Sequence, residues 1–125
     1  MDKLTANELR IGNLVLFSDN STIFEVTGIE IGGLYVKNQV EQTWIEIYTF
    51  EPIPLTEEWL LRLGFDKLGI VYYIIKKVIE INYFNGIVGI DIRGQYVGTP
   101  HIKYVHQLQN LYFALTGEEL TIKSN

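Results

Sequence analysis

Residues 79–92 read IEINYFNGIVGIDI, and this stretch decides the fold of the C-terminal part of the chain. Its Asn85-Gly86 pair favours a two-residue type I′ turn, because both central positions of that turn take a positive φ. Such a turn fixes the strand register and places three pairs on one face: Ile79 with Ile92, Ile81 with Ile90 and Tyr83 with Val88. This face is wholly apolar, so we expect a core to cover it.

The segments before this hairpin predict a further strand and a short helix. The apolar run from Ile70 to Ile75 predicts a third strand of the same sheet. Upstream, Thr56 is a suitable N-cap, and the two glutamates that follow it lie where a helix dipole favours carboxylates. Gly64 is suited to end the helix, so we expect about two turns between these residues.

A longer helix is expected after the hairpin. Thr99 as N-cap and Pro100 at the first helical position predict its start, and Gly117 predicts its end. The three- and four-residue spacing gives it a buried stripe of Ile102, Val105, Leu108, Leu111, Tyr112 and Leu115. Its polar stripe consists of Lys103, His106, Gln107 and Asn110. We expect this helix to cover the apolar face of the hairpin.

The N-terminal part, from Asn13 to Phe50, consists of short β-rich runs separated by turn residues such as those at 18–21 and 32–33. This spacing predicts an antiparallel meander, which by analogy of fold resembles a small SH3-like barrel. The Pro-containing connector at 51–55 is the best boundary, so we expect an α+β chain with lobes at 1–52 and 53–125. The second lobe has the order α-β-β-β-α, and the sequence leaves open whether the two lobes form one compact unit.

Composition excludes several classes of site and partner. The chain has no cysteine, which excludes disulfides, thiolate zinc sites and iron–sulfur clusters. The N-terminus does not resemble a signal peptide and the longest apolar run is too short to cross a membrane, so we expect a cytoplasmic protein without membrane contact. Residues 1–52 hold eight acidic and three basic residues, whereas 53–125 hold seven of each. The N-terminal part is therefore a poor nucleic-acid binder.

One pair of carboxylates is singled out by the hairpin register. Glu80 lies directly across from Asp91 on the face opposite the core, and like charges in that arrangement are mildly destabilising. With Asn82 nearby, the pair could bind a divalent cation through oxygen ligands or share a proton. The favoured interpretation is that a neighbouring cation, Lys76, Lys77 or Arg93, neutralises the pair on a wet surface.

Two further candidate binding sites are only weakly supported by the sequence. His101 and His106 are five residues apart, so on a helix their rings would not share a face as zinc ligands do. The segment 94–100 contains glycines and leads into the expected helix, a geometry that can receive an anion. It lacks the lysine of a phosphate-binding loop, so a plain turn is favoured. We identify no catalytic residue, cofactor site or metal site.

Nucleic-acid contact is the alternative to protein contact. The chain has eight Tyr, six Phe and two Trp, and aromatic rings on a sheet can stack on bases. Four basic residues of the second lobe are placed to follow a phosphate backbone: Lys76, Lys77, Arg93 and Lys103. The acidity of the whole chain makes nucleic acid the less favoured partner without excluding it.

Three stretches carry a resemblance to known proteins: residues 7–13 (NELRIGN), 54–65 (PLTEEWLLRLGF) and 104–117 (YVHQLQNLYFALTG). Together they resemble a family of small bacterial and phage or prophage proteins with no assigned activity. The resemblance implies at most an accessory role in a mobile element or its host. Our leading hypothesis is a non-enzymatic binding or adaptor module that contacts another protein or another copy of itself.

Overall fold

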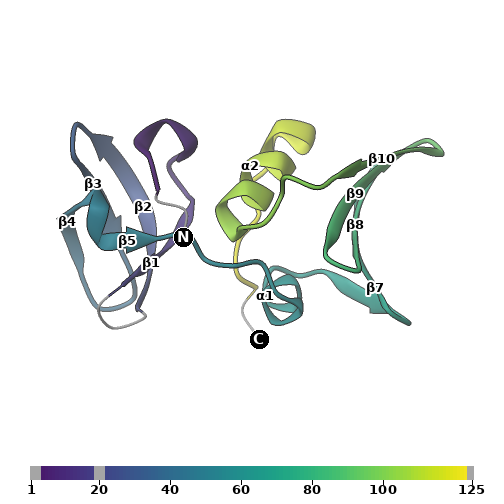
Figure 1. The fold of residues 1–125 in the computed structure, drawn as a ribbon, viewed down its shortest axis with the longest axis horizontal. Coiled ribbons are helices and arrows are strands. Elements are labelled where there is room, and N and C mark those ends of the chain that lie inside the picture. The colour runs from purple at the N-terminus through teal and green to yellow at the C-terminus, as the bar shows by residue number, and fades with distance from the viewer. Residues whose placement is uncertain (1–3, 19–21, 124–125) are drawn as a thin grey trace. The chain divides into compact units, whose positions relative to one another are not determined.

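The computed structural model describes residues 4–18 and 22–123, which form two units (Figure 1). The first unit comprises Met1–Pro54 with Tyr104–Asn110, and the second comprises Leu55–Lys103 with Leu111–Asn125. The sequence-based boundary at residue 52 assigned residues 104–110 to the second lobe, whereas the structure groups them with the first unit. The α+β class is confirmed, since both units contain an antiparallel sheet and the described residues form two α-helices.

The sheet of the first unit has the order β4-β3-β2-β1-β5. Its strands are β1 (Leu14–Phe17), β2 (Thr22–Glu30), β3 (Gly33–Lys37), β4 (Gln42–Glu46) and β5 (Phe50–Glu51), with 3-10 turns at Ala6–Glu8 and Ile47–Thr49. The predicted meander is therefore confirmed. The SH3-like barrel is not confirmed, because the edge strands β4 and β5 do not pair with each other among the described residues, so the sheet does not close. Most of the predicted turn at 18–21 lies outside the described residues.

The core of the first unit lies on one face of this sheet. It is formed by side chains from the N-terminal segment and from four strands: Leu4, Leu9, Val15, Phe24, Val26, Leu34, Val36 and Phe50. Phe17, Phe24 and Phe50 meet edge to face, with ring centroids 6.0 to 6.3 Å apart. Offset and edge-to-face contacts of this kind add to the energy of apolar burial.

The sheet of the second unit is an up-and-down meander in the order β10-β9-β8-β7-β6. Its strands are β6 (Asp66–Leu68), β7 (Val71–Lys76), β8 (Ile79–Phe84), β9 (Ile87–Ile92) and β10 (Gln95–Thr99). The predicted hairpin register is confirmed pair by pair. The apolar face of the hairpin is covered, since Ile81 and Val88 on that face are each only 1% exposed. We call this side of the sheet the inner face.

Each hairpin of this sheet closes through two residues, and the backbone of those residues sets the turn type. Asn85 and Gly86 both have positive φ, as a type I′ turn requires, and so do Arg93 and Gly94. Lys77 has a φ of 57° in the turn between β7 and β8, a position that favours glycine. Because all four turns are this short, no strand can slip without rebuilding its turn.

Helix α1 (Glu57–Arg62) forms as predicted. The hydroxyl of Thr56 accepts a hydrogen bond from the Trp59 amide at 3.3 Å, and Gly64 follows the helix with a φ of 93°. The Phe65 amide donates to the Leu60 carbonyl at 3.0 Å, which satisfies a carbonyl at the helix end. The Tyr72 hydroxyl donates to Glu57 at 2.7 Å and links the inner face to this helix.

Helix α2 (Val105–Thr116) begins later than predicted. Residues 95–99, for which a plain turn was expected, form β10 paired with β9, so the segment 94–100 is not an anion-binding loop at a helix start. Pro100 lies in a turn in which the Ile102 amide donates to the Thr99 carbonyl at 3.2 Å. The second position of a β-turn and the first position of a helix both need the φ that proline provides, so the Thr-Pro pair did not distinguish them. No helix of the described residues is long and apolar enough to cross a membrane.

We predict that Lys77→Gly raises the free energy of unfolding by about 1 kcal/mol, because glycine relieves the left-handed backbone at this position. Lys77→Ala removes the same charge and keeps the unfavourable φ, so it serves as the matched control. Chemical denaturation of the three proteins measures the difference. Equal stability of the glycine and alanine variants would contradict the assignment of this turn.

Candidate functional site

The side of the second sheet opposite the inner face, here called the outer face, exposes many apolar side chains. The strand alternation and the pairing place seven of them there: Leu68, Val71, Tyr73, Ile75, Phe84, Ile87 and Tyr96. Leu68 is 73% exposed, and Ile75 and Tyr96 are each 58% exposed. Scattered single apolar residues on a surface are ordinary, but a contiguous set on one sheet face is typical of a contact surface.

The outer face is hollowed over the strands β6, β7 and β8. An open depression of about 400 Å³ is lined there by Leu68, Val71, Tyr73, Ile75 and Glu80. Four of these five side chains are apolar or aromatic, and the fifth carries a carboxylate. The depression is thus a mainly apolar surface with one charged group at its border.

Glu80 and Asp91 lie opposite each other on the outer face, as the register predicted. The Asn82 side-chain amide donates to Glu80 at 2.9 Å, and the Gly94 backbone amide donates to Asp91 at 2.9 Å. Of the three cations that could neutralise the pair, Lys76 is paired across the sheet with Ile79, on the inner face, and is bound to Glu118 at 2.8 Å. No cluster of three or more histidine, aspartate or glutamate side chains suitable for a metal occurs among the described residues.

Three charged residues of the described strands lie on the outer face, and all are acidic: Asp66, Glu80 and Asp91. Like charges on adjacent strands disfavour each other unless something compensates them. The two hydrogen bonds described above satisfy some oxygen lone pairs but add no positive charge. The outer face therefore combines apolar area with negative charge.

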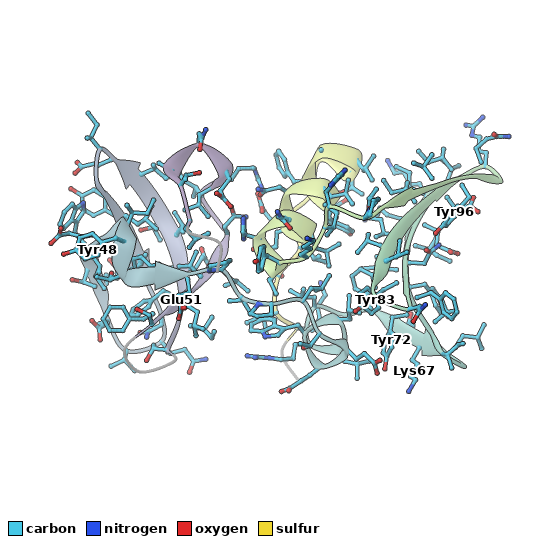
Figure 2. The ribbon with its side chains drawn as sticks, viewed as in Figure 1. Tyr48, Glu51, Lys67, Tyr72, Tyr83 and Tyr96 are labelled. Carbon is cyan, nitrogen blue, oxygen red and sulfur yellow. The ribbon has the colours of Figure 1, made fainter. Side chains whose placement is uncertain are left out.

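Tyr96 lies across the outer face, on the side of the sheet away from α1 (Figure 2). Its ring is accommodated by Gly89, since a Cβ at that glycine would lie 2.5 Å from the tyrosine hydroxyl and from the Asn82 side-chain oxygen. Glycine in a strand often marks such a close approach. The missing side chain thus allows an exposed aromatic ring to lie on the sheet.

The four predicted nucleic-acid contacts do not form one group. Lys76 is paired with Glu118, and Lys103 lies in the connection between β10 and α2. Lys77 and Arg93 lie in turns at the same end of the strands, both with positive φ. The structure therefore brings two of the four to one end of the sheet.

A buried polar cluster in the first unit was missed by the sequence analysis. Gln109, which was assigned to neither the buried nor the polar stripe, is buried, and its side chain accepts from the Leu14 amide at 2.8 Å and donates to the Gly12 carbonyl at 3.2 Å. Asn110 donates to the Glu8 carbonyl at 2.9 Å and accepts from Asn13 at 2.8 Å. These amides satisfy backbone groups that would otherwise be buried without partners.

His106, assigned to a polar stripe, is fully buried in the same cluster. Its Nε2 lies 2.7 Å from a carboxylate oxygen of Glu8, and its ring stacks on Tyr104, whereas His101 is exposed. Burial lowers the pKa of His106, and the bond to Glu8 offsets this only in part, so the neutral ring donates Nε2–H to the carboxylate. Burial alone would raise the pKa of Glu8, but hydrogen bonds from Thr5 and His106 lower it.

A spacing signal for this cluster is present in the sequence. His106, Gln109 and Asn110 are three and four residues apart, so they share one side of a helix. A polar side is ordinarily interpreted as solvent-exposed, and only the facing segment, Glu8 to Leu14, shows that this one is buried. The first and third resemblance stretches therefore meet in one hydrogen-bonded cluster.

A smaller hollow of about 250 Å³ lies in the first unit, lined by Leu16, Glu51, Pro52, Pro54 and Tyr104. Glu51, labelled in Figure 2, is its one charged residue. Comparisons with protein-family models, curated proteins and solved structures find no match for this chain.

We predict that the free energy of unfolding falls as the pH is lowered from 7 to 5. The pKa of His106 is lower in the folded state than in the unfolded chain, so the unfolded chain takes up the proton first, below about pH 6.5. His106→Gln keeps a donor for Glu8 without a titratable ring, and its unfolding free energy should change less over this range. Urea denaturation at several pH values measures both.

His101→Gln is the control for this pH experiment, because it removes a histidine and leaves the buried one in place. It should retain the pH dependence of the unaltered protein. The interpretation of His106 would be wrong if His106→Gln retained the full dependence while His101→Gln lost it.

Proposed function

We propose that this chain is a non-enzymatic binding module and that the outer face of its second sheet contacts another protein. The observation that carries the proposal is the contiguous exposure of apolar side chains on that face, with the open depression between Leu68 and Ile75. Aromatic and aliphatic side chains that bury together supply most of the affinity at protein interfaces. A partner side chain of modest size fits the depression.

The charge of the outer face indicates which kind of partner suits it. Asp66, Glu80 and Asp91 leave it acidic, and two of them lie on neighbouring strands. A partner surface that presents Lys or Arg beside apolar residues would compensate this charge as it covers the sheet. Two copies meeting through this face would bring like charges together, so a second copy is disfavoured here.

We predict that Leu68→Lys combined with Ile75→Lys abolishes partner binding by this face. Both side chains are exposed, and Ile75 lies across from Glu80, which can pair with the new lysine, so the fold should be retained. The tagged protein and the variant are used to capture proteins from the organism that encodes them, and bound proteins are quantified by mass spectrometry. We expect at least a tenfold loss of the specific partner.

Val40→Lys is the matched control, because Val40 is 87% exposed and lies in the first unit. It adds the same kind of charge at an apolar surface position and should leave capture unchanged. Thermal unfolding of each variant verifies that the fold is retained. A partner bound equally well by all three proteins would contradict the proposal.

A nucleic-acid-associated role is the second candidate, supported by the placement of Lys77 and Arg93 at one end of the sheet. Against it, three aromatic residues of this sheet, Tyr73, Phe84 and Tyr96, share the outer face with carboxylates, which repel phosphates. The captured material can be assayed for nucleic acid as well as protein. Nucleic acid that persists through nuclease-controlled washing and is released by salt would favour this role over protein binding.

The resemblance of residues 7–13, 54–65 and 104–117 to small bacterial and phage or prophage proteins belongs to the same proposal. It suggests that the binding module serves as an accessory protein of a mobile element or of its host. A captured partner encoded beside the gene would support this role.

A further inference from the structure

Strand β10 forms one edge of the second sheet, and it lacks the features that protect an exposed edge. Residues 95–99 read QYVGT, with no charge and no proline, and Tyr96 and Val97 are 58% and 60% exposed. The opposite edge, β6, has three residues, and two of them are Asp66 and Lys67. Short, charged edges resist pairing with other chains, whereas an uncharged exposed edge favours it.

The hairpin register shows which backbone groups of β10 are available. Ile92 and Gln95 flank a two-residue turn, so they form a hydrogen-bonded pair, and such pairs recur at every second residue of an antiparallel ladder. Residues 95, 97 and 99 therefore direct their N–H and C=O groups toward β9. Tyr96 and Gly98 direct theirs outward, which leaves two donors and two acceptors along the free edge.

We propose that β10 pairs antiparallel with β10 of a second copy, centred on Val97. In this register Tyr96 lies opposite the partner's Gly98 and exchanges both backbone hydrogen bonds with it. The two-fold axis repeats the same exchange between Gly98 and the partner's Tyr96. All four outward groups of each strand are satisfied, and the two sheets become one continuous sheet.

The side chains of β10 are self-complementary in the same register. Val97 meets the partner's Val97 at a non-hydrogen-bonded position, where side chains approach closely, and both exposed isopropyl groups become buried. The bulky Tyr96 lies opposite a glycine, so two rings never compete for one place. Gln95 lies opposite the partner's Thr99, an uncharged polar pair.

The pairing ends at two copies. A two-fold contact uses the β10 edge of each copy, and the outer edges of the joined sheet are then two β6 strands. These strands are short and charged, so they do not continue the assembly. The contact uses the edge of β10, whereas the depression proposed for the partner lies over β6, β7 and β8, so this dimer and the partner binding can be tested independently.

A single introduced cysteine tests the register, because the chain has no cysteine of its own. In the dimer the two Val97 Cα atoms are about 4.5 Å apart, within the range of a disulfide. The two Gln95 Cα atoms are offset by four residues, or about 14 Å, which no disulfide spans. We expect Val97→Cys to give at least tenfold more disulfide-linked dimer than Gln95→Cys under mild oxidation.

A second variant tests the pairing without a cross-link. Gly98→Pro removes an outward donor but none of the hydrogen bonds to β9, and proline is tolerated on an edge strand. Sedimentation over a hundredfold concentration range should show a dimer for the unaltered chain and a monomer for this variant. Equal cross-linking at both cysteine positions, or an unaltered chain that stays monomeric throughout, would overturn the proposal.

Discussion

The short turns of the second sheet are the constraint on which its surfaces depend. Each hairpin turns through two residues, so each strand has one register, and alternation then assigns every side chain to one of two faces. Ile81 and Val88 are buried in this way, and the same alternation exposes Ile75 and Tyr96 on the other side. The register also determines that β10 presents the backbone N–H and C=O groups of Tyr96 and Gly98 at its free edge. The apolar face, the acidic pair and the free edge thus share one physical origin.

In the first unit, buried side-chain amides fix the N-terminal segment to the start of α2. Gln109 bonds the backbone on both sides of Asn13, and Asn110 bonds the backbone of Glu8, so the start of α2 is fixed to the segment that leads into β1. Removing one partner of such a buried bond costs about 1–3 kcal/mol, because the other group is left unsatisfied. This cluster gives a structural reason for the residue types in two of the three resemblance stretches. Those stretches therefore do not by themselves identify an active site.

Local signals in the sequence predicted the parts of the fold that local interactions determine. Asn85-Gly86 predicted the hairpin and the Glu80–Asp91 pair, and Thr56 and Gly64 predicted the ends of α1. The predicted start of α2 was wrong because Thr99-Pro100 suits both a helix start and the β-turn that follows a strand. The burial of His106 was missed because it depends on Glu8, ninety-eight residues away in the chain. The free edge of β10 was not predicted, because strand β10 itself was not predicted.

We propose that the second sheet is a contact element whose free edge and uncovered face follow from its register. The most direct measurement is amide hydrogen exchange of the unaltered chain, resolved by residue, over a series of protein concentrations. We expect the amides of residues 95, 97 and 99 to be protected at every concentration, and those of Tyr96 and Gly98 to become protected only as the concentration rises. Tyr96 and Gly98 amides that are protected at the lowest concentration, or that exchange freely at the highest, would contradict it.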